Sequence, residues 1–200
     1  MQINDLFHQP HTILLDGGMG TMLQAAGLQL GARPEELNIT DPEAIQRIHG
    51  MYAAAGSRII NTNTFGASAH KLAKSPYTVE EVIAAGVACC KRACAPYGAL
   101  TALDIGPLGE LLEPNGTLPF ETAVSEYARI VRAGVAAGAD LVVVETNLPE
   151  ASIQWLCSHC TAPVLADPVS TIKAPKLLPV LDKLTALKPN RMEAELLSGV

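Results

Sequence analysis

The sequence has few basic residues and no basic run. Its 200 residues include 14 Lys and Arg against 20 Asp and Glu, which gives a formal net charge of -6. Proteins that bind nucleic acid usually gather Lys and Arg on one face to contact the phosphates. The scarcity of positive charge therefore predicts that nucleic acid is not a partner.

The sequence also lacks a targeting signal and a long apolar run. Residues 1–8 read MQINDLFH, without the basic and apolar regions of a signal peptide. No later stretch is long and apolar enough to span a bilayer. We therefore expect no membrane partner and, by default, a cytoplasmic location.

The sequence also lacks the cysteine pattern of a disulfide framework. The five cysteines are an odd number, and three of them lie close together at Cys89, Cys90 and Cys94. Small secreted proteins instead show an even number at regular spacing. We expect reduced thiols that pack against helices. Cys157 and Cys160 have the spacing of half a metal site, but without a second pair we interpret them as structural too.

What the sequence does contain is a regular alternation of short apolar runs and longer helical patterns. A hydrophobic fraction of 48% is enough for the core of one domain. The alternation predicts a parallel sheet wrapped by helices. The predicted strands are residues 12–15, 58–61, 100–104, 141–145, 163–166 and 185–187. The predicted helices are residues 41–55, 78–95 and 120–138, with another starting at 147.

Six strand–helix units are fewer than a closed barrel needs. An eight-fold barrel usually takes roughly 250 residues. The fold class that we predict is α/β, a parallel (β/α) barrel-like fold with about six of eight units, which makes it an incomplete TIM barrel. Its open sheet edges are candidates for self-association.

Polar side chains lie at the ends of several predicted strands. Asp16, Thr62, Asp104 and Glu145 all fall there. In parallel α/β folds, functional groups gather just beyond the carboxyl ends of strands. These four residues are therefore candidates for substrate binding.

The chemistry of this group suits an amino acid. Gly17 and Gly18 let the backbone approach a ligand and leave N–H groups to bind a carboxylate. Asp16 and Glu145 can then hold the ammonium group. The alternative is that Asp16 and Asp104 cap helices and that Glu145 is a solvated loop carboxylate.

Several motifs resemble those of the homocysteine S-methyltransferases, in particular the homocysteine-binding barrel of cobalamin-dependent methionine synthases. The motifs are LLDGGMGT from Leu14, RPEELN from Arg33, AGSRIINTNTFGA from Ala55 and DIGPLG from Asp104. They cover roughly residues 10–146. The resemblance implies a (β/α)8 barrel in which Asp16, Gly17, Thr62 and Glu145 contact the amino and carboxyl groups of homocysteine.

The same resemblance implies a zinc ion held by three cysteines, which activates the substrate thiol. One of these cysteines lies late in the barrel, and the other two are adjacent and preceded by glycines. We recognise none of them here, since Cys89 and Cys90 follow Ala88 in a helical pattern. We therefore assign no metal ligand and no catalytic residue. The methyl donor, cobalamin or methyltetrahydrofolate, belongs to the wider system only.

After residue 146 the motifs change. Residues 147–200 resemble the ribokinase-like carbohydrate kinases, and among them the pseudouridine kinases. The resemblance implies that Asp167, Asn190 and Glu193 order magnesium around the phosphates of ATP. The Gly-Ala-Gly-Asp-like anion hole of these kinases is not recognisable. An alternative is that Asn190 and Glu193 form a helix cap.

These observations predict two parts on one body, residues 1–146 and 147–200. The leading hypothesis is a homocysteine-binding module of the S-methyltransferase class, inactive because the zinc cysteines are missing. One alternative is a fragment of a sugar or nucleoside kinase that uses ATP and magnesium. The other is a non-catalytic product of fusion or truncation.

Overall fold

The computed structural model describes residue 6, residues 12–29 and residues 31–199. Most of the stretch that we examined for a signal peptide lies outside these residues. The elements in chain order are α2 (Met19–Ala25), η1 (Pro34–Glu36), α3 (Leu37–Thr40), α4 (Pro42–Ala54), β1 (Ile59–Asn61), α5 (Val79–Cys94), η2 (Ala95–Tyr97), β2 (Leu100–Ile105), α6 (Phe120–Ala136), β3 (Leu141–Glu145), α7 (Glu150–His159), β4 (Val164–Asp167), η3 (Ala174–Lys183), β5 (Ala186–Leu187) and α8 (Arg191–Ser198).

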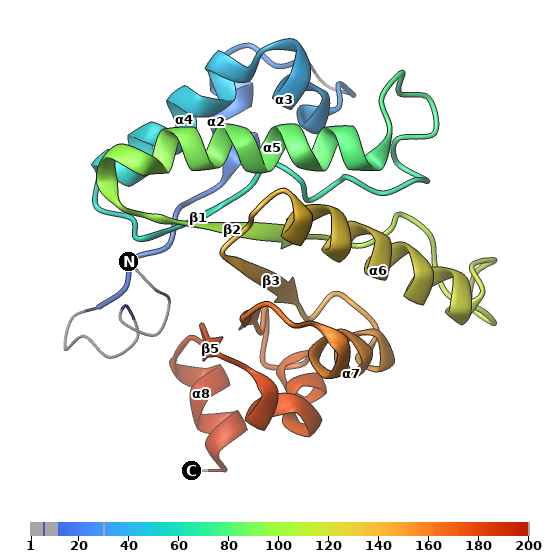
Figure 1. Ribbon diagram of the computed structural model, residues 1–200. Helices are drawn as coiled ribbons and strands as arrows, with labels where there is room; N and C mark the ends of the chain where they lie inside the picture. Colours follow the sequence, from blue (N-terminus) through green and yellow to red (C-terminus); the bar gives the residue numbers. More distant parts are fainter. Residues whose placement is uncertain (1–5, 7–11, 30, 200) are drawn as a thin grey trace.

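The five strands form one parallel sheet in the order in which they occur along the chain. Figure 1 shows α4 and α5 above β1 and β2, with α6 and α7 following the sheet as it curls toward β5. A curled parallel sheet with helices on its outside is part of a (β/α) barrel. The predicted fold class, an incomplete barrel, is confirmed.

The predicted strand at residues 12–15 is reduced to one β-bridge. Leu15 pairs with Ile59, and the backbone bonds beside it run from Asp16 N to Ile59 O and from Arg58 N to Leu14 O. Because β1 has only three residues, it offers a short ladder to a neighbour. The prediction of a full strand was wrong, although the segment lies at the expected edge.

The helix boundaries follow the predicted caps. The Asp41 side chain accepts from Ala44 N at the start of α4. Thr78 and Glu81 form a reciprocal capping box at the start of α5. The helix expected from residue 147 instead begins at Glu150. Residues 146–148 form a turn, in which Leu148 N donates to Glu145 O.

The two faces of the sheet have separate cores. The outer face packs against the helices through a large apolar cluster that includes Leu103, Val142 and Val144. The inner face carries a smaller cluster of alternate strand residues. It comprises Leu6, Ile59, Leu100, Ala102, Leu141, Val143 and Leu165. This alternation decides which strand-end residues point to the inside of the curl.

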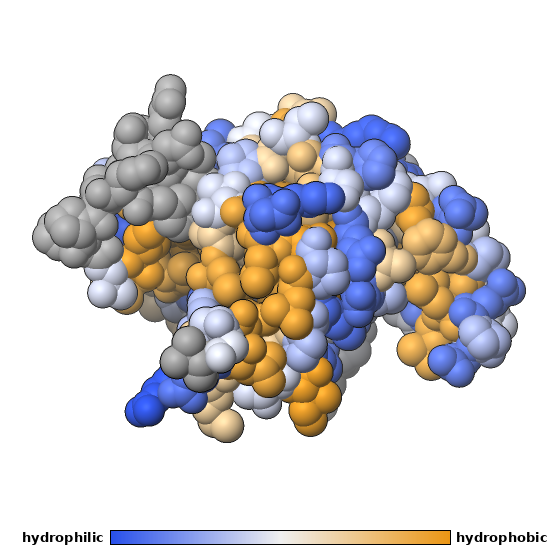
Figure 2. All heavy atoms as spheres, turned by 90° about the horizontal axis from the view of Figure 1, so that it is seen from below, coloured by the Kyte–Doolittle hydropathy of each residue, from blue (hydrophilic) through white to orange (hydrophobic). Residues whose placement is uncertain are grey.

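Some apolar side chains of the segment after β4 are exposed. Ile172 is 90% exposed, and Met192 on α8 is 66% exposed. Figure 2 views the molecule from the side on which α8 lies in Figure 1 and shows apolar side chains gathered in the middle of that face. None of the helices in the described part of the chain has the length and apolar character needed to cross a bilayer.

Candidate functional site

The inner face of the sheet changes from apolar to acidic toward the carboxyl ends of its strands. Asp104, Glu145 and Asp167 occupy the inner positions that follow the apolar cluster on β2, β3 and β4. Glu145 and Asp167 are register partners, so their side chains leave the same face of the sheet. Asp16, which follows the bridge residue Leu15, completes the group. We call these four carboxylates the acidic rim.

The other rim carboxylates are close enough to Asp104 to affect its ionisation. Burial raises the pKa of Asp104 to about 7, and the negative charges of Asp16, Glu145 and Asp167 add to this effect. Like charges close together disfavour the ionised form of each. Asp16, Asp104 and Glu145, which were predicted as one group, therefore lie near one another, and Asp167, which was predicted for a nucleotide site, lies beside them.

Asp16 is held by the neighbouring strand. Its two carboxylate oxygens accept from Asn61 N and Asn61 Nδ2, both at 3.0 Å. Burial raises the pKa of Asp16 to about 7, while these bonds and the charge of Lys188 act in the opposite direction. The Asn61 Oδ1 atom is buried without a partner among the described residues. Asp16 makes no capping bond to α2, so the interpretation of Asp16 as a helix cap was wrong.

Glu145 is half-buried at the end of β3. One carboxylate oxygen accepts from Asn147 Nδ2, and the other, Oε1, is buried with no partner in the described part of the chain. Burial raises the pKa of Glu145, and the charges of Lys173 and Lys71 partly offset this. The interpretation of Glu145 as a solvated loop carboxylate was therefore wrong. Asp104 does not cap a helix either, because it lies within β2.

Thr62 lies next to the rim, but its hydroxyl is already engaged. Thr62 Oγ1 accepts from Asp104 N at 3.1 Å and lies 2.6 Å from Thr64 Oγ1. Thr64 Oγ1 donates to Asp104 O at 2.8 Å, so the Thr62 hydroxyl is the donor between the two threonines. This network fixes the backbone of Asp104. A direct contact between Thr62 and a substrate stays a prediction.

Gly17 packs closely against Tyr52. A side chain at Gly17 would lie 2.9 Å from the Tyr52 hydroxyl oxygen, and that hydroxyl donates to Gly18 O at 3.3 Å. Gly18 precedes the first residue of α2 and is exposed. The absence of a side chain at Gly17 thus lets Tyr52 approach the turn that carries Asp16. Binding of a carboxylate by their N–H groups stays a prediction.

Asp167 carries the rim's one close ion pair within the described residues. Lys188 Nζ lies 2.6 Å from Asp167 Oδ2, and Asp167 Oδ1 accepts from Val169 N at 3.1 Å. Val169 has a φ of 62°, a left-handed conformation that β-branched residues rarely adopt. The bond to Asp167 helps to hold this turn in place.

Asn190 and Glu193 form a helix cap. Glu193 N donates to Asn190 Oδ1 at 3.0 Å, and Asn190 N donates to Glu193 Oε2 at 2.8 Å. Glu193 is only 3% exposed. The alternative interpretation as a capping box is therefore confirmed. Magnesium binding by these residues stays a prediction.

Sequence reasoning missed two charged residues near the rim. Glu35, on η1, accepts from Gly66 N at 2.7 Å and adds to the negative charge that acts on Asp104. Lys188 follows β5 directly, so the rule that flagged the other strand ends also applies to it. Glu35 had no such signal, because it lies on a short helix far along the chain from the strands.

A buried amide pair fixes Glu35 in place. Asn63 Nδ2 donates to Asn38 Oδ1 and to Pro34 O, at 3.0 and 2.8 Å. Asn38 Nδ2 in turn donates to Asn63 O and Val82 O, at 2.8 and 3.2 Å. The motif at residues 33–38 is therefore docked on the loop after β1, beside the rim.

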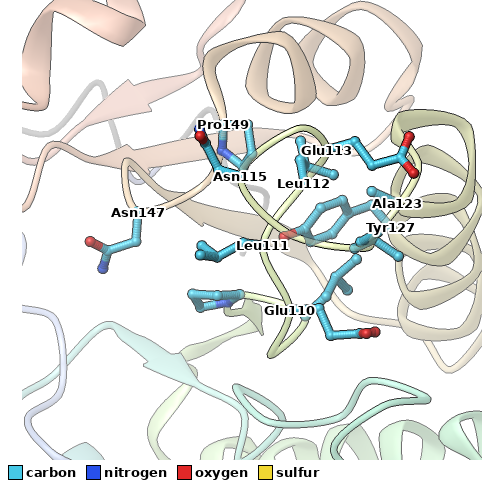
Figure 3. A pocket seen from close by; sticks show the side chains of 12 residues that line it. Glu110, Leu111, Leu112, Glu113, Asn115, Ala123, Tyr127, Asn147 and Pro149 are labelled. Atoms are coloured by element: carbon cyan, nitrogen blue, oxygen red, sulfur yellow. The ribbon is translucent and has the colours of Figure 1, made fainter.

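A cavity of about 310 Å³ lies beside the turn that follows β3. Asn147, which donates to Glu145, also lines this cavity. Figure 3 shows Tyr127 in the wall, with Leu111 and Leu112 near it, between the loop after β2 and the start of α7. The cavity gives the acidic rim a largely apolar neighbour.

The donors at the rim do not suit zinc. They are carboxylates, hydroxyls, amides and a lysine, with no thiolate or imidazole among them, whereas the zinc site that the resemblance implies has three thiolates. Cys89, Cys90 and Cys94 are buried in α5, as expected, and Cys157 and Cys160 lie at the end of α7. In the part of the chain that the structure describes, no three His, Cys, Asp or Glu side chains are grouped to hold a metal ion.

A family model described as homocysteine S-methyltransferase matches residues 13–172. The match continues past residue 146, where the motifs predicted a boundary between two parts of the chain. That boundary stays a prediction. Methionine synthase from Mycobacterium tuberculosis is 30% identical over 144 residues, which cover 66% of this chain and 12% of that protein.

Pseudouridine kinase from Escherichia coli is 31% identical over 93 residues, 46% of this chain and 30% of that protein. This match is longer than the segment after residue 146, so it includes upstream residues as well. The chain thus spans less than a third of the length of either curated relative.

Among solved structures, the metallated form of the homocysteine methyltransferase MmuM from Escherichia coli superposes with a TM-score of 0.73. The sequence identity is 23%, over 92% of this chain and 76% of that chain. At this identity the likeness shows a shared barrel-type fold. Because the family model covers well over half of the sequence, the chain belongs to the homocysteine S-methyltransferase family.

Proposed function

We propose that this chain is a homocysteine-binding module, in which the acidic rim holds the ammonium group of the amino acid. One observation carries the proposal. The rim has more hydrogen-bond acceptors than donors, and one of the acceptors, Glu145 Oε1, is buried without a partner among the described residues. A buried acceptor without a donor is unfavourable. An ammonium group supplies three donors and a positive charge at that place.

The adjoining cavity supports an amino acid with a short apolar side chain. The lining residues Leu111, Leu112 and Tyr127 are apolar or aromatic. Asn147 lines this cavity and donates to Glu145, and we propose that the side chain of a ligand bound at the rim extends toward the cavity. Two methylene groups and a sulfur atom suit such a lining.

Binding of homocysteine does not by itself imply that this chain transfers a methyl group. The family activates the thiol with zinc, and the residues at the rim do not fit that metal. We therefore propose binding without zinc-dependent turnover, with cobalamin or methyltetrahydrofolate serving as donor only in a larger system.

Isothermal titration with L-homocysteine tests the proposal. Wild-type protein should bind more tightly at pH 8 than at pH 6, by on the order of tenfold, because Asp104 has a pKa of about 7 and its ionised form attracts the ammonium. Glu145→Gln should weaken binding, whereas Glu43→Gln, an exposed change on α4, should not.

The same titration with added zinc addresses turnover. The proposal expects unchanged affinity and no methionine with a methyl donor present. Absence of homocysteine binding at both pH values would refute the binding proposal. Zinc-dependent formation of methionine would refute the proposal of binding without turnover.

The alternative function, a kinase, is supported by fewer residues than the homocysteine-binding module. It depends on Asp167, Asn190 and Glu193, and the last two are engaged in the cap of α8. Titration with ATP and magnesium tests this alternative directly. Saturable binding that is lost in Asp167→Asn would favour the kinase over the homocysteine module.

A further inference from the structure

Lys188 lies at the open end of the acidic rim. It comes directly after β5, and its backbone N donates to Ala166 O at 3.0 Å, so it stands beside Asp167 on the neighbouring strand. Its Nζ atom pairs with Asp167 Oδ2 at 2.6 Å, and its side chain is still 51% exposed. An ammonium group has three donors, so an exposed lysine in this pair can accept a further anionic partner.

The positive charge of Lys188 affects a residue at the other edge of the curled sheet. Its charge lowers the pKa of Asp16, although Asp16 lies beside β1, at the opposite edge of the sheet from β5. Two other cations, Lys173 and Lys71, act on Glu145 and have other contacts. Lys173 Nζ donates to Asn147 Oδ1, and Lys71 lies 5.3 Å from the centre of the Phe65 ring.

An amino acid bound at the rim needs a positive group for its carboxylate. The predicted site, the turn at Gly17 and Gly18, precedes a helix of only seven residues, whose dipole provides a partial charge. A lysine ammonium provides a full charge in a half-exposed position.

We infer that Lys188 binds the α-carboxylate of the amino acid whose ammonium group is held by Asp104 and Glu145. This inference rests on the proposed function. Lys188 lies beyond residue 172, where the match to the family model ends. The residue that selects amino acids over simple amines is therefore supplied by the carboxyl-terminal part of the chain.

The test compares two ligands that differ only in the carboxylate, L-homocysteine and 3-aminopropane-1-thiol. Titration calorimetry at pH 8 should show wild-type protein binding homocysteine at least about tenfold more tightly, in line with a charge-assisted contact. Lys188→Gln should bring the two affinities close together. Lys183→Gln removes the same charge at the far end of η3, where Lys183 donates to Ser158 Oγ, and should keep the wild-type ratio.

A further variant separates binding from structure. Lys188→Arg keeps a positive charge at this position, so the preference for homocysteine over the amine should persist. Thermal unfolding of Lys188→Gln checks that the variant folds.

The outcomes are distinct. If the wild type binds both ligands equally, or if Lys188→Gln keeps the preference, this inference fails and the proposed function stands. If the wild type binds neither ligand, both fail.

Discussion

Two carboxylates of the rim are buried in an environment that disfavours their ionised form. Asp16 and Asp104 each have a pKa of about 7, in both cases mainly because of burial. Near neutral pH each of them is therefore partly protonated. The protein folds although burial disfavours the ionised form of both side chains, and a cationic ligand would stabilise that form.

Replacing Asp104 by Asn should raise the thermal stability of the ligand-free protein at pH 8. The pKa of Asp104 rises from 3.8 to about 7 on folding, so its contribution to stability is greatest below pH 4. That contribution is lost as the pH rises to about 7 and stays lost above it. Asn carries no charge to lose. Thermal unfolding followed by circular dichroism from pH 4 to pH 8 should show a gain of several degrees at pH 8 that shrinks toward pH 4.

The exposed variant Asp182→Asn is the matched control and should show no such trend. A gain of the same size at every pH would mean that the Asp104→Asn substitution acts through packing. A loss of stability at pH 8 would contradict the account of the rim.

His49 presents the opposite case. It is fully buried on α4, burial lowers its pKa from 6.5 to about 4, and neither ring nitrogen has a partner among the described residues. Its contribution to stability is lost as the pH falls from 6.5 toward 4, because the unfolded chain binds the proton first.

His49→Leu should therefore stabilise the fold by about 1–2 kcal/mol, since it removes buried polar atoms without partners. The gain should be larger at pH 5 than at pH 8. Urea unfolding at the two pH values measures the difference. Destabilisation at both would indicate that the ring makes a contact that Leu cannot replace.

At the scale of residues, the sequence predicted the rim because its members occupy a regular position. Asp104, Glu145 and Asp167 each lie at or beside the carboxyl end of a predicted strand, and the period of two places them on the inner face. Glu35 could not be predicted in this way, because its position depends on the docking of η1 against the loop after β1.

At the scale of elements, two segments distant in sequence are joined by the amides of Asn38 and Asn63. Asn38 links α3, the loop after β1 and the first half of α5. Gly86 on α5 leaves room for this link, since a side chain there would lie 2.7 Å from Asn38 Nδ2.

Asn38→Ala should lower the free energy of unfolding by about 2–4 kcal/mol, because it leaves several buried polar groups without partners. Urea unfolding measures this loss. Asn190→Ala is a useful comparison, since it removes only a helix cap and should cost about 1 kcal/mol. Equal losses in the two variants would show that the Asn38 network contributes little.

The caps were predictable because they depend on residues three positions apart, as in Thr78 and Glu81. The lengths of the strands were less predictable from the sequence. Residues 12–15 have a strand composition, yet pairing depends on the partner, and β1 offers only three residues.

At the scale of the whole molecule, the open sheet should favour self-association. We expect a second copy of the chain to cover the face near β5, where Met192 and Leu196 on α8 are 66% and 44% exposed. Light scattering over a range of concentrations should detect dimers, and the double variant Met192→Lys, Leu196→Lys should shift the protein toward monomer. Wild-type protein that stays monomeric at high concentration would contradict this expectation.

The segments before and after residue 146 contribute strands to one sheet. β1 to β3 come from the part before residue 146, and β4 and β5 from the part after it. The sequence predicted a common body but could not show that Lys188 would face Asp16, because that relation depends on how far the sheet curls.

A crystal structure of the protein with L-homocysteine, grown at pH 8, tests the central claim most directly. The account predicts the ammonium nitrogen within hydrogen-bond distance of Asp104 and Glu145, and the carboxylate at Lys188. Homocysteine bound away from the acidic rim, or bound there with its ammonium group pointing to solvent, would contradict it.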